Sequence, residues 1–544
     1  MAASLLLAAG AGGQPAPLPA HDPAAAGGLL FAAADRCLAC HNGLVTPAGA
    51  DVSIGADWQT SMMANAARDP YWQAAVRREL LDHPESAAAI EDKCSTCHMP
   101  MARTATRAAG GTGGVFAHLP IGAHPAGLGP LAADGVSCSV CHQIQPDGLG
   151  EPASFTGGFA IAPVSGAAGA GAAGRTVYGP FTVIPGLARV MASATAFAPA
   201  AGTHVQTSEL CATCHTLHTH SLGPGGAATG ELPEQAPYLE WRESAFAREG
   251  RSCQSCHMPE AAAPTPASSV LGEPRAALSR HVFRGGNFLM PRIFQRFAAE
   301  LGVTASPGQL ELMAARTREH LATASARLEV ASAPATAPGE VAVDVTVVNL
   351  AGHKLPTAYP SRRAWLHLVV RDAAGAVVFE SGAPRPDGSI AGNDNDADPA
   401  VHEPHHDAIT APGQVQIYET ILAAPDGTLT TGLLTATGYA KDNRLLPRGF
   451  AKTAAPADVA VHGTALADAD FTAGGDRVRY RVAVGAAPRP LRVEARLWYQ
   501  PIAHRWAENL AAYDAAETAR FVRMYRAVAG ESAIVLAAAE VAVP

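Results

Sequence analysis

The chain has few aromatic residues, few charged residues and no long apolar run in its interior. Aromatic residues make up 6% and charged residues 16% of its 544 residues, and 48 Asp and Glu outnumber 39 Lys and Arg, for a formal charge of −9. This deficit of positive charge argues against a nucleic-acid partner, since such binding depends on Lys and Arg contacts to phosphates. No stretch of about 20 apolar residues follows the N-terminal segment, so no membrane span is expected.

Several common signatures of enzymes are also missing. We find no glycine-rich phosphate loop, no nucleophile elbow and no pattern typical of nicotinamide or flavin binding. The length is sufficient for two to four domains with ample core. Chemistry must therefore be sought among the cysteines and histidines.

All ten cysteines belong to one repeated pattern, Cys-x-x-Cys-His. This pattern is the attachment signature of c-type haem. The two thiols form thioethers with the haem vinyl groups, and the adjacent histidine becomes the proximal iron ligand. The sequence therefore predicts five covalent haem c groups, at Cys37, Cys40 and His41; Cys94, Cys97 and His98; Cys138, Cys141 and His142; Cys211, Cys214 and His215; and Cys253, Cys256 and His257.

A zinc knuckle, a redox dithiol or a disulfide would be the alternative explanation of each Cys-x-x-Cys pair. Zinc sites usually need two such pairs close together, and a redox dithiol normally occurs once. Neither the zinc knuckle nor the redox dithiol explains why a histidine follows at the same offset five times. Histidine makes up 21 of 544 residues, so five coincidences have a probability on the order of one in ten million by composition alone.

The first 20 residues resemble a signal peptide. An apolar run begins at Leu5, and small residues and a proline-rich stretch follow it, although a basic start is missing. Haem attachment to this motif requires an exported, unfolded chain, which supports the same interpretation independently. We expect a periplasmic or extracellular protein.

The composition changes after the last cysteine and divides the chain. We expect a signal-peptide-like segment at 1–20, a pentahaem cytochrome domain of helix and loop at 21–305, and an amphipathic helix and linker at 306–335. Residues 336–544 are expected to form an all-β, sandwich-like domain with one added helix near 503–529. The evidence for the β-domain is alternation of apolar and polar residues, at 340–349, 364–370, 377–381, 415–421, 477–484, 491–499 and 533–543.

The first half resembles the multihaem cytochromes of the group that includes the tetrahaem partner of hydroxylamine oxidoreductase. Besides the haem motifs, this resemblance is carried by a repeated W-x-x-S-x-x-A segment at 58–64 and 241–247, by 208–215, and by an H-x-F-x-G-G-N segment at 281–287. The second half resembles a β-domain appended to many bacterial multihaem cytochromes, through 352–357 and 360–365. The superfamily includes electron carriers and reductases, so the resemblance does not specify a substrate.

The chain departs from this group in one respect. The group often carries a distal histidine in the W-x-x-S-x-H-A helix, where this chain has Met63 in the first copy and Phe246 in the second. Phenylalanine cannot bind iron. Methionine can, and His/Met coordination raises the reduction potential. Met63 is therefore either a distal ligand or a packing residue.

Five irons need five further ligands if all are six-coordinate. Histidines outside the motifs are the first candidates, since bis-histidine coordination is common in multihaem chains. We select His83, His124, His204 and His281 from the first half. His353 is the best candidate in the second half, because it lies at a strand-to-loop junction and the resemblance implies that this loop reaches toward a haem. The alternative is a structural histidine in a tight turn.

An acidic loop in the second half suggests a calcium site. Asp394, Asp396 and Asp398 put carboxylates at alternate positions, and Ca²⁺ prefers such oxygen ligands. The glycine and distal glutamate of an EF-hand loop are absent, so a solvated turn is the competing interpretation.

The sequence favours an electron carrier with unidentified donor and acceptor proteins. One rival is an oxidoreductase in which one haem iron keeps an open position and acts on a small nitrogen or sulfur compound. Another is a structural subunit of a cytochrome filament or surface complex, and the sequence also leaves a homo-oligomer open.

Overall fold

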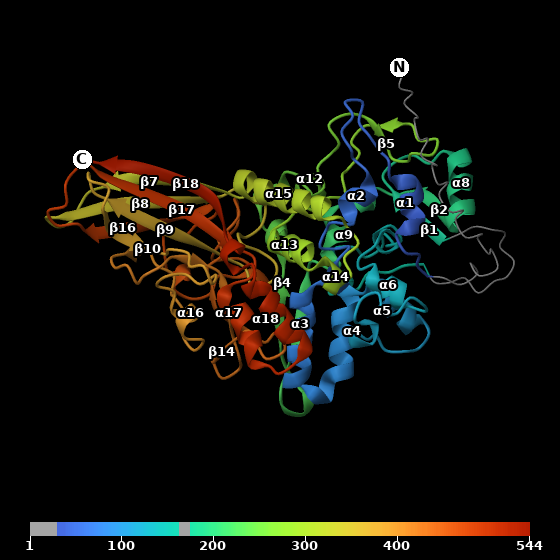
Figure 1. Ribbon diagram of the computed structural model, residues 1–544, viewed down its shortest axis with the longest axis horizontal. Coiled ribbons are helices and arrows are strands. Elements are labelled where there is room, and N and C mark those ends of the chain that lie inside the picture. The colour runs from blue at the N-terminus through green and yellow to red at the C-terminus, as the bar shows by residue number, and fades with distance from the viewer. Residues whose placement is uncertain (1–29, 163–174) are drawn as a thin grey trace, which may run out of the picture.

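The computed structural model describes residues 30–162 and 175–544, and the predicted signal segment at 1–20 lies outside them. A region of helices and loops and a β-rich C-terminal region lie side by side along the longest axis of the molecule (Figure 1). The β-rich region is the one expected from the alternating pattern. No helix within the described ranges is long and apolar enough to cross a membrane.

The first region consists mainly of short helices joined by long loops. Its helices are α1 (Asp35–His41), α2 (Ile54–Trp58), α3 (Pro70–Asp82), α4 (Ala87–His98), α5 (Pro100–Ala108), α6 (Gly129–Ala133), α7 (Cys138–Cys141), α8 (Pro185–Thr195), α9 (Ser208–Ala212), α10 (Pro237–Arg242), α11 (Ala245–Arg248), α12 (Cys253–His257), α13 (Leu289–Arg296) and α14 (Ala298–Leu301). Three small strand pairs join them, β1 (Arg175–Gly179) with β2 (Phe197–Ala201), β3 (Leu217–Leu222) with β4 (Ala228–Gln235), and β5 (Thr265–Pro266) with β6 (Pro274–Arg275).

Two larger sheets form the C-terminal region. One has the order β10-β9-β17-β18 with β12 also paired to β9, and the other has the order β11-β16-β8-β7. The strands are β7 (Ala326–Ala333), β8 (Glu340–Asn349), β9 (Arg363–Arg371), β10 (Val377–Ser381), β11 (Ala408–Ile409), β12 (Ile417–Tyr418), β16 (Gly475–Ala483), β17 (Leu491–Gln500) and β18 (Ile534–Val543), and a small third sheet contains β13 (Thr420–Ala423), β14 (Leu429–Thr430) and β15 (Gly438–Asp442).

The apolar residues that alternate along these strands explain how the sheets pack. Val341, Val343, Val345 and Val347 of β8 are all buried, because side chains two positions apart point to the same face of a strand. They belong to one hydrophobic cluster together with residues of β9, β16 and β17. The two sheets therefore share a common core.

The structure differs from the expected boundaries at several places. The expected strand at 415–421 is divided between β12 and β13, which belong to different sheets. Helix α15 (Pro307–Ala324) ends earlier than the predicted amphipathic segment, and β7 follows it directly. Leu328 is buried while its neighbours in β7 are exposed, a two-residue alternation that the helical pattern of the preceding residues obscured. The segment near 503–529 contains two helices, α17 (His504–Glu508) and α18 (Ala516–Arg526), rather than one.

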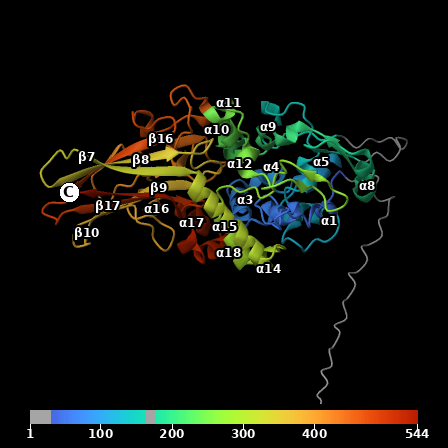
Figure 2. The same cartoon turned by 90° about the horizontal axis from the view of Figure 1, so that it is seen from above.

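Helix α18 joins the two halves. It packs against α3 of the first region (Figure 1), and Arg77 of α3 makes two hydrogen bonds to Glu517, at 2.9 and 3.0 Å. Tyr71 of α3 and Phe294 of α13 belong to the same hydrophobic cluster as the β-strands. Packing over a shared core, and not a single linker, therefore connects the halves. The view from above shows the same lengthwise arrangement (Figure 2).

Candidate haem-binding sites

Each Cys-x-x-Cys-His motif lies in or directly beside a short helix. The five helices are α1, the end of α4, α7, α9 and α12. Positions i, i+3 and i+4 of a helix share one face, so this spacing brings both thiols and the imidazole of a motif to the same side. The sulfur atoms are unpaired with one another as disulfides. All five motifs thus present the atoms that covalent haem attachment needs.

Four motif histidines have a fixed tautomer that suits iron binding. Nδ1 of His41 donates to the carbonyl of Ala267 at 2.6 Å, and His98, His142 and His257 make the same type of bond at 3.0, 2.6 and 2.5 Å. A carbonyl oxygen can only accept, so Nδ1 carries the proton and Nε2 keeps its lone pair. Such a hydrogen bond is the usual support of a metal-binding histidine.

Burial keeps the imidazoles of His98 and His257 neutral. It lowers the pKa of His98 and of His257 to about 4, from 6.5. The pKa of His281, one of the predicted distal ligands, is lowered to about 3 for the same reason. Metal binding requires a deprotonated nitrogen, and these rings offer one at neutral pH. The residues present therefore fit haem c.

Cysteines of different motifs lie near one another. The thiol of Cys37 is close enough to that of Cys138 for each to shift the pKa of the other. The corresponding neighbours in the remaining motifs are Cys97 with Cys214, and Cys211 with Cys253. In the order of the chain, motif 1 thus adjoins motif 3, and motif 4 adjoins motifs 2 and 5. Cys141 of motif 3 also lies close enough to Cys214 of motif 4 for their charges to interact, so the five sites form one connected group.

Two predicted distal histidines face a motif histidine across a gap. The rings of His142 and His281 have centres 6.3 Å apart and an interplanar angle of 23°. Those of His257 and His353 are 6.2 Å apart at 15°. Two imidazoles bound to one iron from opposite sides would have ring centres roughly 6 Å apart, because each ligand nitrogen lies about 2 Å from a transition metal. Both separations fit a haem iron between the rings.

These two distal rings also have the tautomer that iron binding requires. Nδ1 of His281 donates to the carbonyl of Ser279 at 3.1 Å, and Nδ1 of His353 donates to that of Lys354 at 2.8 Å. Nε2 of each ring is therefore free to bind a metal. The two pairs, His142 with His281 and His257 with His353, bring together residues far apart in the sequence.

A third histidine near this second pair was missed by sequence reasoning. His320 lies on α15, and its ring centre is 6.2 Å from that of His257, at an interplanar angle of 67°. Its position inside an ordinary amphipathic helix gave no signal. The only clue in the sequence is that histidine is rare there.

The other predicted distal ligands are placed less favourably. Nε2 of His204 donates to the carbonyl of Ile144 at 3.0 Å, and Nε2 of His124 donates to that of Leu119 at 3.3 Å. Each ring thus keeps only Nδ1 for a metal, an arrangement that does not favour either residue as a ligand. His83 is buried, and its Nε2 lies 3.5 Å from the Thr435 hydroxyl.

Met63 lies in the turn after α2, where its carbonyl accepts a hydrogen bond from Val136 at 2.9 Å. This contact fixes the backbone of the residue beside the third motif. Iron binding by Met63, His83, His124 and His204 stays a prediction.

The repeated tryptophans both anchor the segment that leads into a motif. The indole of Trp58 donates to the carbonyl of Val136 at 3.0 Å, and that of Trp241 donates to the carbonyl of Arg251 at 2.8 Å. Each acceptor lies two residues before the first cysteine of a motif, Cys138 or Cys253. The W-x-x-S-x-x-A repeat therefore has the same structural role twice, and the two motifs it anchors are those with a facing histidine.

Phe246 stands where the resembling group often carries a distal histidine. It is buried, and a Cβ added to Gly352 would lie only 3.0 Å from its ring. Gly352 directly precedes His353. The second half of the chain thus brings a histidine next to the position at which the first half lacks one.

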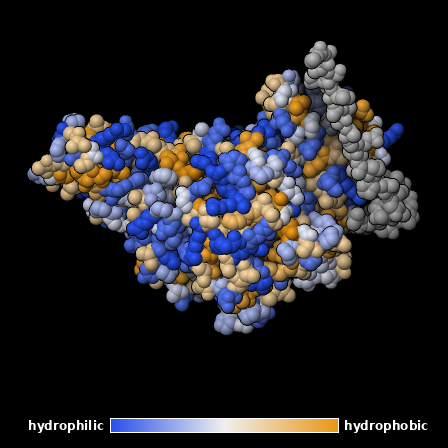
Figure 3. Space-filling model, viewed as in Figure 1, coloured by the Kyte–Doolittle hydropathy of each residue, from blue (hydrophilic) through white to orange (hydrophobic). Residues whose placement is uncertain are grey.

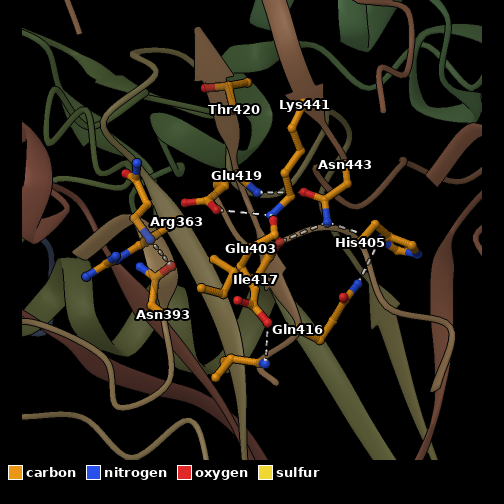
Figure 4. Close-up of polar contacts among 12 residues, drawn as sticks. Arg363, Asn393, Glu403, His405, Gln416, Ile417, Glu419, Thr420, Lys441 and Asn443 are labelled. Carbon is orange, nitrogen blue, oxygen red and sulfur yellow. Dashed lines mark hydrogen bonds and ion pairs between the residues drawn. The ribbon is translucent and has the colours of Figure 1, made fainter. Parts of the chain in front are cut away.

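His405, Asp468 and Asp476 form a compact group of metal-ligand type in the β-rich region. Nδ1 of His405 accepts hydrogen bonds from Gln416 at 2.8 Å and Asn443 at 3.0 Å (Figure 4). The orientation of both amides is fixed, because their oxygens accept from backbone N–H groups. The proton of the neutral ring is therefore on Nε2, which donates to Asp468 at 3.0 Å. The group is satisfied as a hydrogen-bond network and leaves no nitrogen for a metal.

Among the described residues, the three predicted calcium ligands do not form a group of metal-ligand type, so calcium binding stays a prediction that this geometry does not favour. Residues Asp394–Ala397 form helix α16, in which Asp394 is exposed and Asp396 is buried. Asp396 pairs with Arg363 at 2.8 Å, with both side chains almost fully buried, and also accepts from the Ile390 N–H at 2.8 Å. Alternation along the sequence placed these carboxylates on different sides of a helical turn.

Replacing Asp396 with asparagine should lower the free energy of unfolding by about 3 kcal/mol, because Arg363 is then left as a buried charge without its partner. Thermal unfolding of the variant and of Asp394→Asn, an exposed control, measures the effect. Millimolar Ca²⁺ should leave the melting temperature of the unmodified protein unchanged. A rise with Ca²⁺ that Asp394→Asn abolishes would restore the calcium site.

Comparisons with known proteins support the fold. No protein-family model matches the chain, and no curated protein matches it. Among solved structures, the penta-haem cytochrome c552 from Thermochromatium tepidum is similar, with a TM-score of 0.52 and 16% sequence identity, covering 95% of this chain and 100% of that chain. At this identity the similarity shows a common fold. The chain thus has a multihaem cytochrome fold over nearly its whole length, and membership of the hydroxylamine oxidoreductase partner group stays a prediction.

Proposed function

We propose that the protein carries electrons between redox partners through five covalently attached haem c groups, outside the cytoplasm. Haem c supplies reversible one-electron chemistry at its iron, and its potential depends on the axial ligands and on burial. The observation that carries the proposal is the arrangement of the five motifs. Each offers two thiols in or directly beside a helix, four offer an imidazole whose Nε2 is free, and every site has a cysteine near a cysteine of another site.

The residues of this chain would have two roles, haem attachment and iron binding. The ten cysteines attach the haems, and His41, His98, His142, His215 and His257 are the proximal ligands. His281 and His353 would be the distal ligands of the haems attached beside His142 and His257, which the ring separations of 6.3 and 6.2 Å support. Neighbouring cysteines link site 1 to site 3 and site 4 to sites 2 and 5, and the charge of Cys214 acts on Cys141, which links site 4 to site 3.

A second function, an oxidoreductase with one open iron, has one observation in its favour. Within the described ranges, no imidazole faces the ring of His41, His98 or His215, whereas one faces His142 and one faces His257. The positive charge of Arg362 acts on His215. An open iron beside a guanidinium would suit a small anion of nitrogen or sulfur. The electron carrier is preferred because no residue with a catalytic role is identified at this site.

The position of the partner surface is not specified by hydropathy. Hydrophilic side chains cover much of the middle of the face shown in Figure 3, and apolar residues lie there in small groups. Such a face is typical of a soluble protein with brief partner contacts. The donor and acceptor are therefore identified only as redox proteins.

Denaturing mass spectrometry of the protein, produced with haem-attachment machinery, should give the polypeptide mass plus five haem masses. The matched control is the variant with both Cys253 and Cys256 replaced by serine, which should lose one haem mass because thioethers cannot form there. A pyridine haemochrome assay gives an independent count. A polypeptide that matures without haem would contradict the proposed function.

A further inference from the structure

Four charged side chains form a buried cluster where the two halves meet. They are Glu240 of α10, Lys354 of the loop after β8, Asp442 at the end of β15, and Arg444, with exposed fractions of 0%, 0%, 1% and 7%. Lys354 Nζ donates to Asp442 at 2.7 Å. Arg444 donates to Asp442 at 2.8 and 2.9 Å and to Glu240 at 2.7 Å. The two positive and two negative charges balance.

Glu240 is the member that comes from the haem half. Its carboxylate accepts from the backbone N–H of Lys354 at 3.1 Å and from the hydroxyl of Thr357. His353 lies directly before Lys354, and its own carbonyl accepts from the Asn349 side chain at 2.9 Å. The backbone on both sides of His353 is therefore held by side chains that are themselves buried.

The energetics of such a cluster point to positioning rather than to stability. Burial alone would raise the pKa of Asp442, but the charges of Arg444 and Lys354 hold it below its usual range. Buried ion pairs contribute little net stability compared with apolar residues of similar size, yet removing one member is strongly unfavourable. Other arrangements of the loop would leave a buried charge without its partner. The cluster therefore favours a single arrangement of the loop.

The position of Glu240 in the chain adds to this argument. It directly precedes Trp241, whose indole holds the segment before Cys253. One turn of α10 thus contacts both the fifth haem motif and the loop that carries the histidine facing it. The rings of His257 and His353, one on each side of this helix's contacts, have centres 6.2 Å apart.

We propose that Glu240 is a positioning residue for His353: through Lys354 and Thr357 it holds the loop of the β-rich half so that the His353 imidazole faces His257. This inference rests on the proposed function, because it assigns a task to Glu240 only if an iron lies between the two rings. Glu240 itself does not bind the iron. It acts through the backbone of the loop.

Glu240→Gln tests the inference, since it keeps the size of the side chain and removes its charge. In holoprotein with five haem masses, one of the five haems should change from low-spin to high-spin in low-temperature EPR, and about one carbon monoxide should bind per chain. The matched control is Asp396→Asn, which also breaks a buried ion pair of the β-rich half but not at the His353 loop. It should lower the melting temperature and leave all five spin states unchanged.

A second, milder variant tests the same inference if Glu240→Gln folds poorly. Thr357→Val removes one hydrogen bond to Glu240 and should give a partial high-spin signal from the same haem. Five haem masses with unaltered spin states in both Glu240→Gln and Thr357→Val would overturn the positioning role, while the proposed function would stand. A chain that matures without haem would instead overturn the proposed function.

Discussion

His353→Ala is expected to convert one of the five haems from low-spin to high-spin, with all five still covalently attached. The reason is that His353 faces His257 at 6.2 Å with nearly parallel rings, and its Nε2 is free because Nδ1 donates to the Lys354 carbonyl. Without this imidazole the iron held by His257 loses its second axial ligand. Low-temperature EPR and carbon monoxide binding, with one new site per chain, measure the change.

His320→Ala is the matched control for this experiment. His320 lies at the same 6.2 Å from His257, but it is on α15, whereas His353 is the ring whose Nδ1 hydrogen bond to Lys354 leaves Nε2 for the iron. Its removal should leave every haem low-spin. The opposite result, a high-spin haem in His320→Ala and none in His353→Ala, would assign the ligand to α15 and leave His353 as a turn residue.

His281→Ala should open a different haem, the one attached at Cys138 and Cys141. His281 faces His142 at 6.3 Å, and burial keeps it neutral, with a pKa of about 3. We expect one high-spin iron per chain. In the double variant with His353→Ala the two effects should add to two high-spin irons, because the two pairs involve separate motifs.

His204→Ala serves as the control for this second variant. His204 also lies near His142, whose pKa its charge affects, but its Nε2 donates to the Ile144 carbonyl. The spectrum should therefore be unchanged. If His204→Ala opened a haem and His281→Ala did not, the distal ligand of the third site would be His204.

The strands of the second half were predictable because their signal is local. The alternation at 340–349 corresponds to β8, and that at 377–381 to β10, with the same ends. In contrast, β7 was missed, because a helical pattern runs directly into it and sequence alone does not tell where one period ends. The proposed calcium ligands are a second case in which a local pattern did not indicate the tertiary contacts. Asp396 forms a buried ion pair with Arg363 of β9, a residue that the local pattern could not indicate as its partner.

The sequence by itself determined where haem can be attached. Spacing within five residues brings two thiols and an imidazole together in or directly beside a short helix, and this depends little on the rest of the chain. Only the tertiary structure decided which histidine faces which motif, and how Glu240 reaches the loop after β8. These relations join residues such as His142 and His281, or Glu240 and Lys354, that are far apart along the chain. Their distances follow from the packing of helices and sheets over a shared core, which a local pattern does not encode.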